Sequence, residues 1–406
     1  MVTAATPFTP APDKESMKTD HSVAVADGAH SHGPEPAGQR FTSFSVADFP
    51  VPTGREEEWR FSPVDRFQAF FADELTGAAP TVVVDTAPGV HSDQVPRTDE
   101  RLGRIGAPTD RVSAAAWHSF AEATVITVGA NQTPSQPTSV AITGSGDTDP
   151  GAQHLLIVAE EHSEATIILN HFGAAQLAQT VEVDVREGAQ LTVVSLQEWE
   201  PGSVHLGGHR SQVGRNAKLK HVVVTLGGDV VRLTPDVALA EPGGEVEKIG
   251  MYFTDSAQHQ EHRMLVDHVA PHCISRVTYK GALQGKDAHA VWIGDVVIRA
   301  EAEGTDTYEL NRNLVLTEGA RADSVPNLEI ETGEIEGAGH ASATGRFDDE
   351  QLFYLRARGI PEIEARRLVV IGFFAELINE IAVPEVTDRL TSAIEQEIQQ
   401  YEAVSA

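Results

Sequence analysis

A strand and turn pattern that repeats through the middle of the chain constrains the fold most. In each unit, alternating apolar residues lead into a turn of small residues and then into a second alternating run, as in LLIVAEEHSEATIILN and VEVDVREGAQLTVVSL. The expected turns fall near Glu164-Ala165, Gly188-Ala189, Asn216-Ala217 and Gly244-Glu245, about 24 to 28 residues apart, and again near Gly319-Ala320. Repeats of this length without intervening helices indicate a stacked β-solenoid, in which each coil buries its inward side chains against its neighbours.

An antiparallel β-sandwich with hairpins at similar spacing is the alternative architecture. The solenoid is favoured because the units resemble one another and lack the Asn-Gly and Asp-Gly turns typical of tight hairpins. Aromatic residues make up only 6% of the chain, so the core is expected to consist of Ala, Val, Ile and Leu. We therefore predict a mainly β protein with a solenoid core over residues 126–346.

Helical regions are expected on both sides of this core. Apolar residues between Asp48 and Asp73 recur close to helical spacing, which predicts a mostly helical region over residues 41–125. After Arg346 the period becomes helical again and predicts a C-terminal helical domain over residues 347–406. Its last helix carries an apolar stripe formed by Val386, Leu390, Ile394 and Ile398.

The first 40 residues differ from the rest in composition. They are rich in Pro, Ala, Gly, Ser and Thr, and almost no apolar residue recurs at a helix or strand period. Such a segment buries too little surface to offset its ordering entropy, so residues 1–40 are predicted to form a disordered tail. Its His21, His30 and His32 are interpreted as incidental rather than as a metal site.

Charge and cysteine content exclude several classes of protein. The chain has 30 Lys and Arg against 60 Asp and Glu, a formal net charge of −30, which argues against nucleic acids and anionic membranes as partners. The single cysteine, Cys273, excludes an intramolecular disulfide and a site made only of cysteines within one chain. There is no apolar run of about 18 residues and no signal peptide, so a soluble cytoplasmic protein is expected.

No common catalytic signature occurs in the sequence. The chain lacks G-x-x-x-x-G-K-[ST], G-x-S-x-G, H-E-x-x-H and C-x-x-C motifs, so no ATPase activity of its own is expected. Two histidine-bearing stretches remain. One contains His259, His262, His268, His272 and Cys273, and it is interpreted as surface histidines beside a buried cysteine, although an extended segment would place His262, His268 and His272 on one face.

The second stretch is Gly337-Ala-Gly-His340-Ala-Ser-Ala-Thr-Gly345, in which small residues surround one imidazole. Small neighbours allow another chain or a ligand to approach His340 closely. A loop histidine exposed only to solvent is the alternative interpretation.

Three segments of the sequence carry a resemblance to a known family. The run from His340 to Pro361, HASATGRFDDEQLFYLRARGIP, resembles the C-terminal signature of the SufB/SufD family of iron–sulfur cluster assembly proteins. Asn313-Leu-Val-Leu316 with Pro326-Asn-Leu-Glu-Ile330, and Glu57-Glu58-Trp59-Arg60-Phe61, are similar to further motifs of that family. The resemblance covers about residues 45 to 400, and the position of the E-E-W motif near the start favours the SufD branch.

The resemblance implies a right-handed parallel β-helix with helical terminal regions. It also implies a non-catalytic scaffold subunit of a SufBCD-type complex, in which a SufC-type ATPase binds the C-terminal helices and a SufB-type paralogue shares a transient iron–sulfur cluster. His340 matches the family histidine implicated at the interface with the paralogue, which makes it the candidate ligand of iron or of the cluster. Relatives often have C-[ST]-H-G there, whereas this chain has Ala338-Gly339-His340-Ala341 and so lacks the neighbouring thiol.

Several alternatives remain open at the level of sequence. A carbohydrate-active enzyme with a β-helix fold would share the repeat pattern. The SufB-type subunit itself is a further alternative, against which the single cysteine in the solenoid and the short N-terminal region count. A reduced flavin bound to the complex is a further cofactor that the resemblance leaves open.

Overall fold

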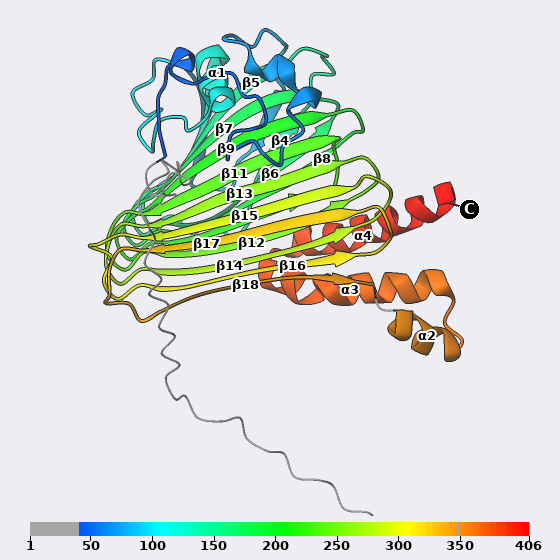
Figure 1. The fold of residues 1–406 in the computed structure, drawn as a ribbon. Coiled ribbons are helices and arrows are strands. Elements are labelled where there is room, and N and C mark those ends of the chain that lie inside the picture. Colours follow the sequence, from blue (N-terminus) through cyan, green and yellow to red (C-terminus); the bar gives the residue numbers. More distant parts are fainter. Residues whose placement is uncertain (1–39, 348, 406) are drawn as a thin grey trace, which may run out of the picture. The chain divides into compact units, whose positions relative to one another are not determined.

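Two nine-stranded sheets enclose a common hydrophobic core in the computed structural model, which describes residues 40–347 and 349–405 (Figure 1). From β3 onward the chain alternates between the two sheets. Sheet A contains β1 (Thr81–Asp85), β4 (Thr138–Thr143), β6 (Glu164–Gly173), β8 (Gln190–Trp199), β10 (Lys218–Thr225), β12 (Glu245–Thr254), β14 (Ile274–Leu283), β16 (Asp306–Val315) and β18 (Gly337–Arg346). Sheet B contains β2 (Val90–Pro96), β3 (Glu122–Val128), β5 (Gly151–Ala159), β7 (Gln176–Val185), β9 (Val204–Val213), β11 (Val230–Leu239), β13 (His259–His268), β15 (His289–Ile298) and β17 (Arg321–Ile330).

Neighbouring strands within each sheet run parallel, with two exceptions at one end of the stack. There β1 pairs antiparallel with β4, and β2 pairs antiparallel with β3. The parallel register places equivalent residues of successive coils directly beside one another. The predicted mainly β fold, a parallel β-solenoid with helices in both terminal regions, is confirmed. The predicted tail, with His21, His30 and His32, lies outside the described residues.

One turn of each coil is built around a residue in the left-handed backbone region. Seven such residues, with φ between 51° and 76°, are Asn131, His162, Gly188, Asn216, Gly243, His272 and Gly304. Each donates its backbone N–H to the equivalent turn of the next coil, as from His162 to the Glu187 carbonyl at 3.0 Å and from Gly188 to the Arg215 carbonyl at 2.9 Å. Glycine and asparagine adopt this conformation most readily, which explains why they recur at the spacing seen in the sequence.

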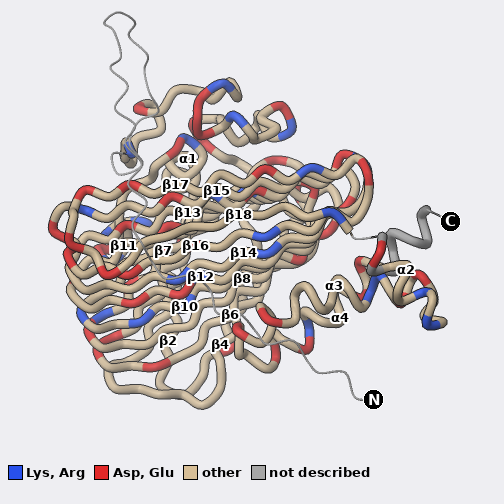
Figure 2. Tube along the Cα trace, turned by 60° about the horizontal axis from the view of Figure 1, so that its bottom comes forward, with Lys and Arg blue, Asp and Glu red and all other residues tan. Residues whose placement is uncertain are grey.

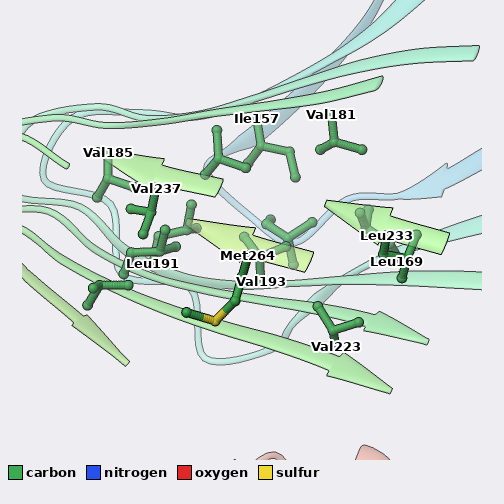
Figure 3. Packing of buried hydrophobic residues seen from close by; sticks show 14 of the residues in the cluster. Ile157, Leu169, Val181, Val185, Leu191, Val193, Val223, Leu233, Val237 and Met264 are labelled. Carbon is green, nitrogen blue, oxygen red and sulfur yellow. The ribbon is translucent and has the colours of Figure 1, made fainter. Parts of the chain in front are cut away.

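The interior is filled mainly by aliphatic side chains from both sheets. Ile157 and Val181 of sheet B face Leu169 and Val193 of sheet A in the same cluster, and Met264 fills the space farther along the stack (Figure 3). All five are buried to 1% exposure or less. Alternate residues of each strand therefore point into the core, as the period of two in the repeat units predicts.

The N-terminal region covers the outer face of sheet B. It contains α1 (Arg111–Ser119) and the one-turn 3-10 helices η2 (Val46–Asp48), η3 (Val64–Arg66) and η4 (Gln68–Phe71), together with strands β1 and β2. Residues 41–125 are therefore not mostly helical, in contrast to the prediction. The aromatic residues that indicated helical spacing form a compact cluster instead, in which the Trp59 ring lies 5.5 Å from that of Phe71 and 6.1 Å from that of Phe67.

The C-terminal helices cover the outer face of sheet A. They are α2 (Asp349–Ala357), α3 (Glu362–Ile381) and α4 (Pro384–Ser405), and α3 contacts β12 and β14 (Figure 1). Ala382, with φ of 55°, separates α3 from α4. The predicted apolar stripe is buried in the cluster that these helices form with the sheet, and it consists of Val386, Leu390, Ile394 and Ile398.

Candidate functional site

The last coil leaves both sheets with a free edge. Within the described residues, β18 and β17 are the terminal strands of sheets A and B, so each has a strand neighbour on one side only. Their side chains are mostly half-buried or exposed, whereas every residue of β5 is buried. We call these two strands the open end of the solenoid.

His340 lies at this open end. Its strand β18 pairs with β16, and the register places His340 opposite Glu309. Alternate residues of β16, from Thr307 through Glu309 to Asn313, are buried in the interior. Because partners in a parallel register point to the same side of a sheet, His340 is positioned at the mouth of the interior, where its side chain is exposed.

A row of inward residues runs along sheet A and ends at His340. Its members, one from each successive strand, are Ile167, Val193, His221, Lys248, Val277, Glu309 and His340. We call this set the inner row. It is aliphatic in β6 and β8 and mostly titratable from β10 onward, which is unusual because ionisable groups in a core carry a large desolvation cost.

Glu309 is a buried carboxyl group of this row. It is 1% exposed, and neither of its carboxyl oxygens has a hydrogen-bond partner among the described residues. Burial raises the pKa of Glu309 to about 8, and the negative charge of Asp295 acts in the same direction. The side chain reaches across the interior toward sheet B, where a Cβ atom on Gly294 would lie 2.8 Å from Oε1. The same Cβ atom would lie 2.4 Å from the Trp292 ring, so the missing side chain at position 294 leaves room for both the indole and the carboxyl group.

Lys248 and His221 form a second buried group together with His209 of β9. The Lys248 Nζ atom has no hydrogen-bond partner among the described residues, and burial lowers the pKa of Lys248 to about 7. His209 Nδ1 lies 3.2 Å from His221 Nε2, and their rings stack with centroids 5.3 Å apart. Burial is also the main cause that lowers the pKa of His209 to about 3. All three side chains are therefore held where positive charge is disfavoured.

A hydrogen-bonded network of other polar groups lies near the open end. The Tyr252 hydroxyl donates to Asn313 Oδ1, Asn311 donates to the Tyr252 hydroxyl at 3.1 Å, and Asn313 donates to Ser324 Oγ at 2.9 Å. Because Ser324 belongs to β17, this network joins the two sheets across the interior. Gly281 makes room for it, since a Cβ atom there would lie 1.8 Å from the Tyr252 ring.

The histidine-rich stretch before Cys273 is structural, and its histidines are not mainly on the surface as predicted. His262 is buried and bonded to Thr225 Oγ1 at 2.9 Å, and His268 is buried and bonded to Ser275 Oγ at 2.9 Å. His272 is exposed, but it occupies a left-handed turn and so does not share a strand face with the other two. The prediction that Cys273 is buried is confirmed, and burial raises the pKa of its thiol.

The E-E-W motif also has a structural role. The Arg232 guanidinium lies 4.0 Å from the centroid of the Trp59 ring, and it forms ion pairs with Glu58 and with the buried Glu261. Asp110, which caps α1 through the Ser113 N–H at 2.7 Å, lies 3.7 Å from the same guanidinium. This network attaches the N-terminal region to the outer face of sheet B.

A surface groove of about 710 Å³ runs over the outside of sheet A beside the link between α3 and α4. It is the feature most relevant to a carbohydrate-active enzyme, because acidic and basic residues line it. Lys218 pairs with Glu245 at 2.8 Å and Lys220 with Glu247 at 3.2 Å, so these side chains are engaged in ion pairs. Acidic and basic residues both occur along the turns of the coils (Figure 2).

Two negative findings apply to the described residues. They contain no group of three or more His, Cys, Asp or Glu side chains arranged to hold a metal ion. Among them, no helix combines the length and apolar character needed to cross a membrane. A metal at His340 would therefore need ligands from water or from another chain in addition to those this chain supplies.

Three of the site residues were missed by sequence reasoning, namely His221, Lys248 and Glu309. A signal for them does exist in the repeat. Each follows the left-handed turn residue of its coil by five positions, the turn residues being Asn216, Gly243 and Gly304. Aligning the coils on those turns would have placed all three in one row with Ile167 and Val193.

Comparisons with known proteins agree with this architecture. Residues 142–373 match the family described as SUF system FeS cluster assembly, SufBD core domain. The chain is 54% identical over 386 residues to the iron-sulfur cluster assembly SufBD family protein Rv1462 of Mycobacterium tuberculosis, a match that covers 93% of this chain and 96% of that protein.

More distant relatives carry a more specific name. The iron-sulfur cluster assembly protein SufD of Escherichia coli is 28% identical over 302 residues, covering 71% of this chain and 70% of that protein. SufD of Bacillus subtilis is 27% identical over 253 residues, covering 60% of this chain and 57% of that protein.

Proposed function

Because the chain belongs to the SufBD family of iron–sulfur cluster assembly proteins, we propose that it is a non-catalytic scaffold subunit on which a cluster is built together with a SufB-type paralogue. The cluster is the cargo of this scaffold rather than a resident cofactor. ATP hydrolysis is assigned to a SufC-type partner, since the sequence contains no phosphate-binding loop.

The exposure of His340 at the open end is the observation that carries this proposal. A cluster under assembly has to be reached by iron, by sulfide and by ligands of the partner, and His340 is exposed on an edge strand whereas Cys273 is buried. Neutral imidazole is a suitable iron ligand near neutral pH, and thiolates of the partner would complete the coordination.

The free edges of β17 and β18 support the location of the paralogue. Edge strands present unpaired backbone N–H and C=O groups, and they are templates for pairing with a strand of another chain. A similar solenoid that continued both sheets would cover the half-buried residues of the last coil. It would also enclose His340 between the two subunits.

The exposed apolar residues of the C-terminal helices support the location of the ATPase. The large side chains at the surface of α2 and α3, which are 43% to 74% exposed, are Phe353, Tyr354, Ile363 and Leu368. The opposite face of α3 is buried against sheet A through residues such as Val370 and Phe374. The exposed residues are thus available to a partner without disturbing the fold.

Reconstitution of the complex tests the role of His340. The full chain, the paralogue and the ATPase are mixed anaerobically with ferrous iron and sulfide, and cluster formation is followed by visible absorption. His340→Ala is expected to reduce cluster formation several-fold. The matched control is His91→Ala, because His91 is also exposed but lies on β2 at the other end of the stack. Cluster formation at the wild-type rate by His340→Ala would contradict the proposal.

Copurification tests the ATPase surface. Phe353→Asp combined with Tyr354→Asp should reduce recovery of the ATPase at least tenfold, since both side chains are more than half exposed on α2. Val83→Asp is the control, because Val83 is 60% exposed on β1, away from the C-terminal helices. If the control loses the ATPase and the α2 variant retains it, the binding surface is elsewhere.

A further inference from the structure

We propose that Glu309 is a second ligand of the His340 site, so that this chain itself holds one ferrous ion through an imidazole and a carboxylate. This inference rests on the proposed function, because it identifies a further residue of the same site. It concerns the state of the subunit before the partner contributes its ligands.

Position is the first argument. Glu309 and His340 are direct register partners on adjacent parallel strands, and both belong to the inner row. Adjacent strands lie about 4.8 Å apart, which brings side chains of this length within reach of one metal ion, whose neighbouring ligand atoms are roughly 3 Å apart. Nitrogen from imidazole and oxygen from carboxylate are common ligands of ferrous iron.

The absence of any competing partner for the carboxyl group is the second argument. Buried polar groups in proteins are almost always hydrogen-bonded, yet both oxygens of Glu309 lack a partner among the described residues. Rotation of this side chain toward His340 would therefore break no hydrogen bond. The Tyr279 hydroxyl and Trp292 Nε1 also lack a partner among the described residues, but the indole N–H is a donor only, and burial raises the pKa of Tyr279 and so keeps its hydroxyl protonated.

The surroundings of the pair are the third argument. Small residues flank His340 on β18, including Gly339, Ala341 and Ser342, and the His340 side chain is itself exposed. No other His, Cys, Asp or Glu completes a group of three among the described residues, so a bound ion would keep open coordination positions. Such positions are what a scaffold needs if sulfide and the partner are to add ligands later.

Metal binding to the full isolated chain tests this inference. Anaerobic calorimetric titration with Fe²⁺, and titration with Co²⁺, whose visible spectrum reports the coordination geometry, are carried out on the wild type and on variants. We expect His340→Ala and Glu309→Gln each to weaken binding at the site at least tenfold. Glu309→Leu is a second variant without the carboxylate, in case Glu309→Gln fails to fold, and Glu318→Gln is the exposed carboxylate control.

The outcomes separate this inference from the proposed function. Loss of binding in both the histidine and the glutamate variants, with an unchanged control, supports the pair. Loss with His340→Ala alone overturns the assignment of Glu309 and leaves His340 in place. If the wild type binds no ion, or if neither variant changes binding, the two-ligand site is wrong, whereas cluster formation in the reconstituted complex still decides the role of His340.

Discussion

The two ends of the inner row differ in the type of their side chains and in how deeply these side chains are buried. At Ile167 and Val193 the side chains are aliphatic and fully buried, with strands on both sides. At Glu309 and His340 the side chains are titratable, and only His340 is exposed, because among the described strands β18 has a neighbour on one side only. The same repeat thus builds a dry core at one end and a polar, accessible mouth at the other. Proteins accept such a cost in stability mainly where the residues have a function.

The largest effect is expected at the aliphatic end of the row. Ile167→Ala should destabilise the fold by about 2 to 5 kcal/mol, because it leaves a cavity between two sheets that cannot collapse freely. Ile330→Ala is the matched control at the open end, where Ile330 is 43% exposed, and it should cost less than about 1 kcal/mol. Chemical denaturation of both variants measures the difference, and equal losses would contradict the contrast between the ends.

A pair of glycine substitutions tests how tightly the interior is packed relative to the open end. Gly281→Ala should cost about 3 kcal/mol, since the added methyl would overlap the Tyr252 ring at 1.8 Å and displace a hydroxyl that is bonded to Asn313. Gly345→Ala on β18 should be nearly neutral, because the nearest atom to its added methyl is 4.0 Å away. Thermal unfolding of the two variants provides the test, and a neutral Gly281→Ala would mean that the interior is loosely packed.

Replacement of the buried lysine should stabilise the protein. The Lys248 ammonium group has no hydrogen-bond partner among the described residues, and Lys248→Met fills the same space without it, so a gain of about 1 to 3 kcal/mol is expected at pH 7. Asp236 raises the pKa of Lys248 against the effect of burial, and Lys248 contributes to the lowered pKa values of His209 and His221.

The pH dependence of this variant follows from the lowered pKa of Lys248. Between the unfolded pKa near 10.5 and the folded value of about 7, the unfolded wild type binds a proton that the folded state does not bind. The free energy of unfolding of the wild type should therefore fall as the pH is lowered through this range. The difference in stability between Lys248→Met and the wild type should grow from pH 10 to pH 7 and stay constant below pH 7. Chemical denaturation of both proteins at several pH values measures this difference in stability. A difference that does not change with pH would contradict the lowered pKa of the buried lysine.

The smallest effect on stability is expected at His340 itself. His340→Ala should change the free energy of unfolding by no more than about 0.5 kcal/mol, because the side chain is exposed on the last strand. An unchanged free energy of unfolding together with a several-fold loss of cluster formation would show that His340 acts in function and not in stability. A large drop in melting temperature would instead make His340 a structural residue.

Sequence reasoning predicted much of the fold because its signals are local. The alternation of the strands, the left-handed turns at Gly188 and Asn216 and the stripe on the last helix each depend on residues close together in the chain. The N-terminal region was interpreted incorrectly because burial of Trp59 and Phe71 requires only a cluster against the sheet, and helical spacing arises there without a helix. The histidines near Cys273 were placed on the surface because their cover comes from distant strands.

The sequence by itself determined that the chain is a repeat of strands and turns with helices at its ends, that it has no phosphate-binding loop, and that His340 lies among small residues. These properties are set by residue type and short-range spacing. Only the tertiary structure decided which side chains share a row, that Lys248 and Glu309 are buried without a hydrogen-bond partner among the described residues, and that β17 and β18 are the last strands of the described sheets. Those properties depend on the register between strands about 30 residues apart and on what covers each face, and both arise only when the coils stack.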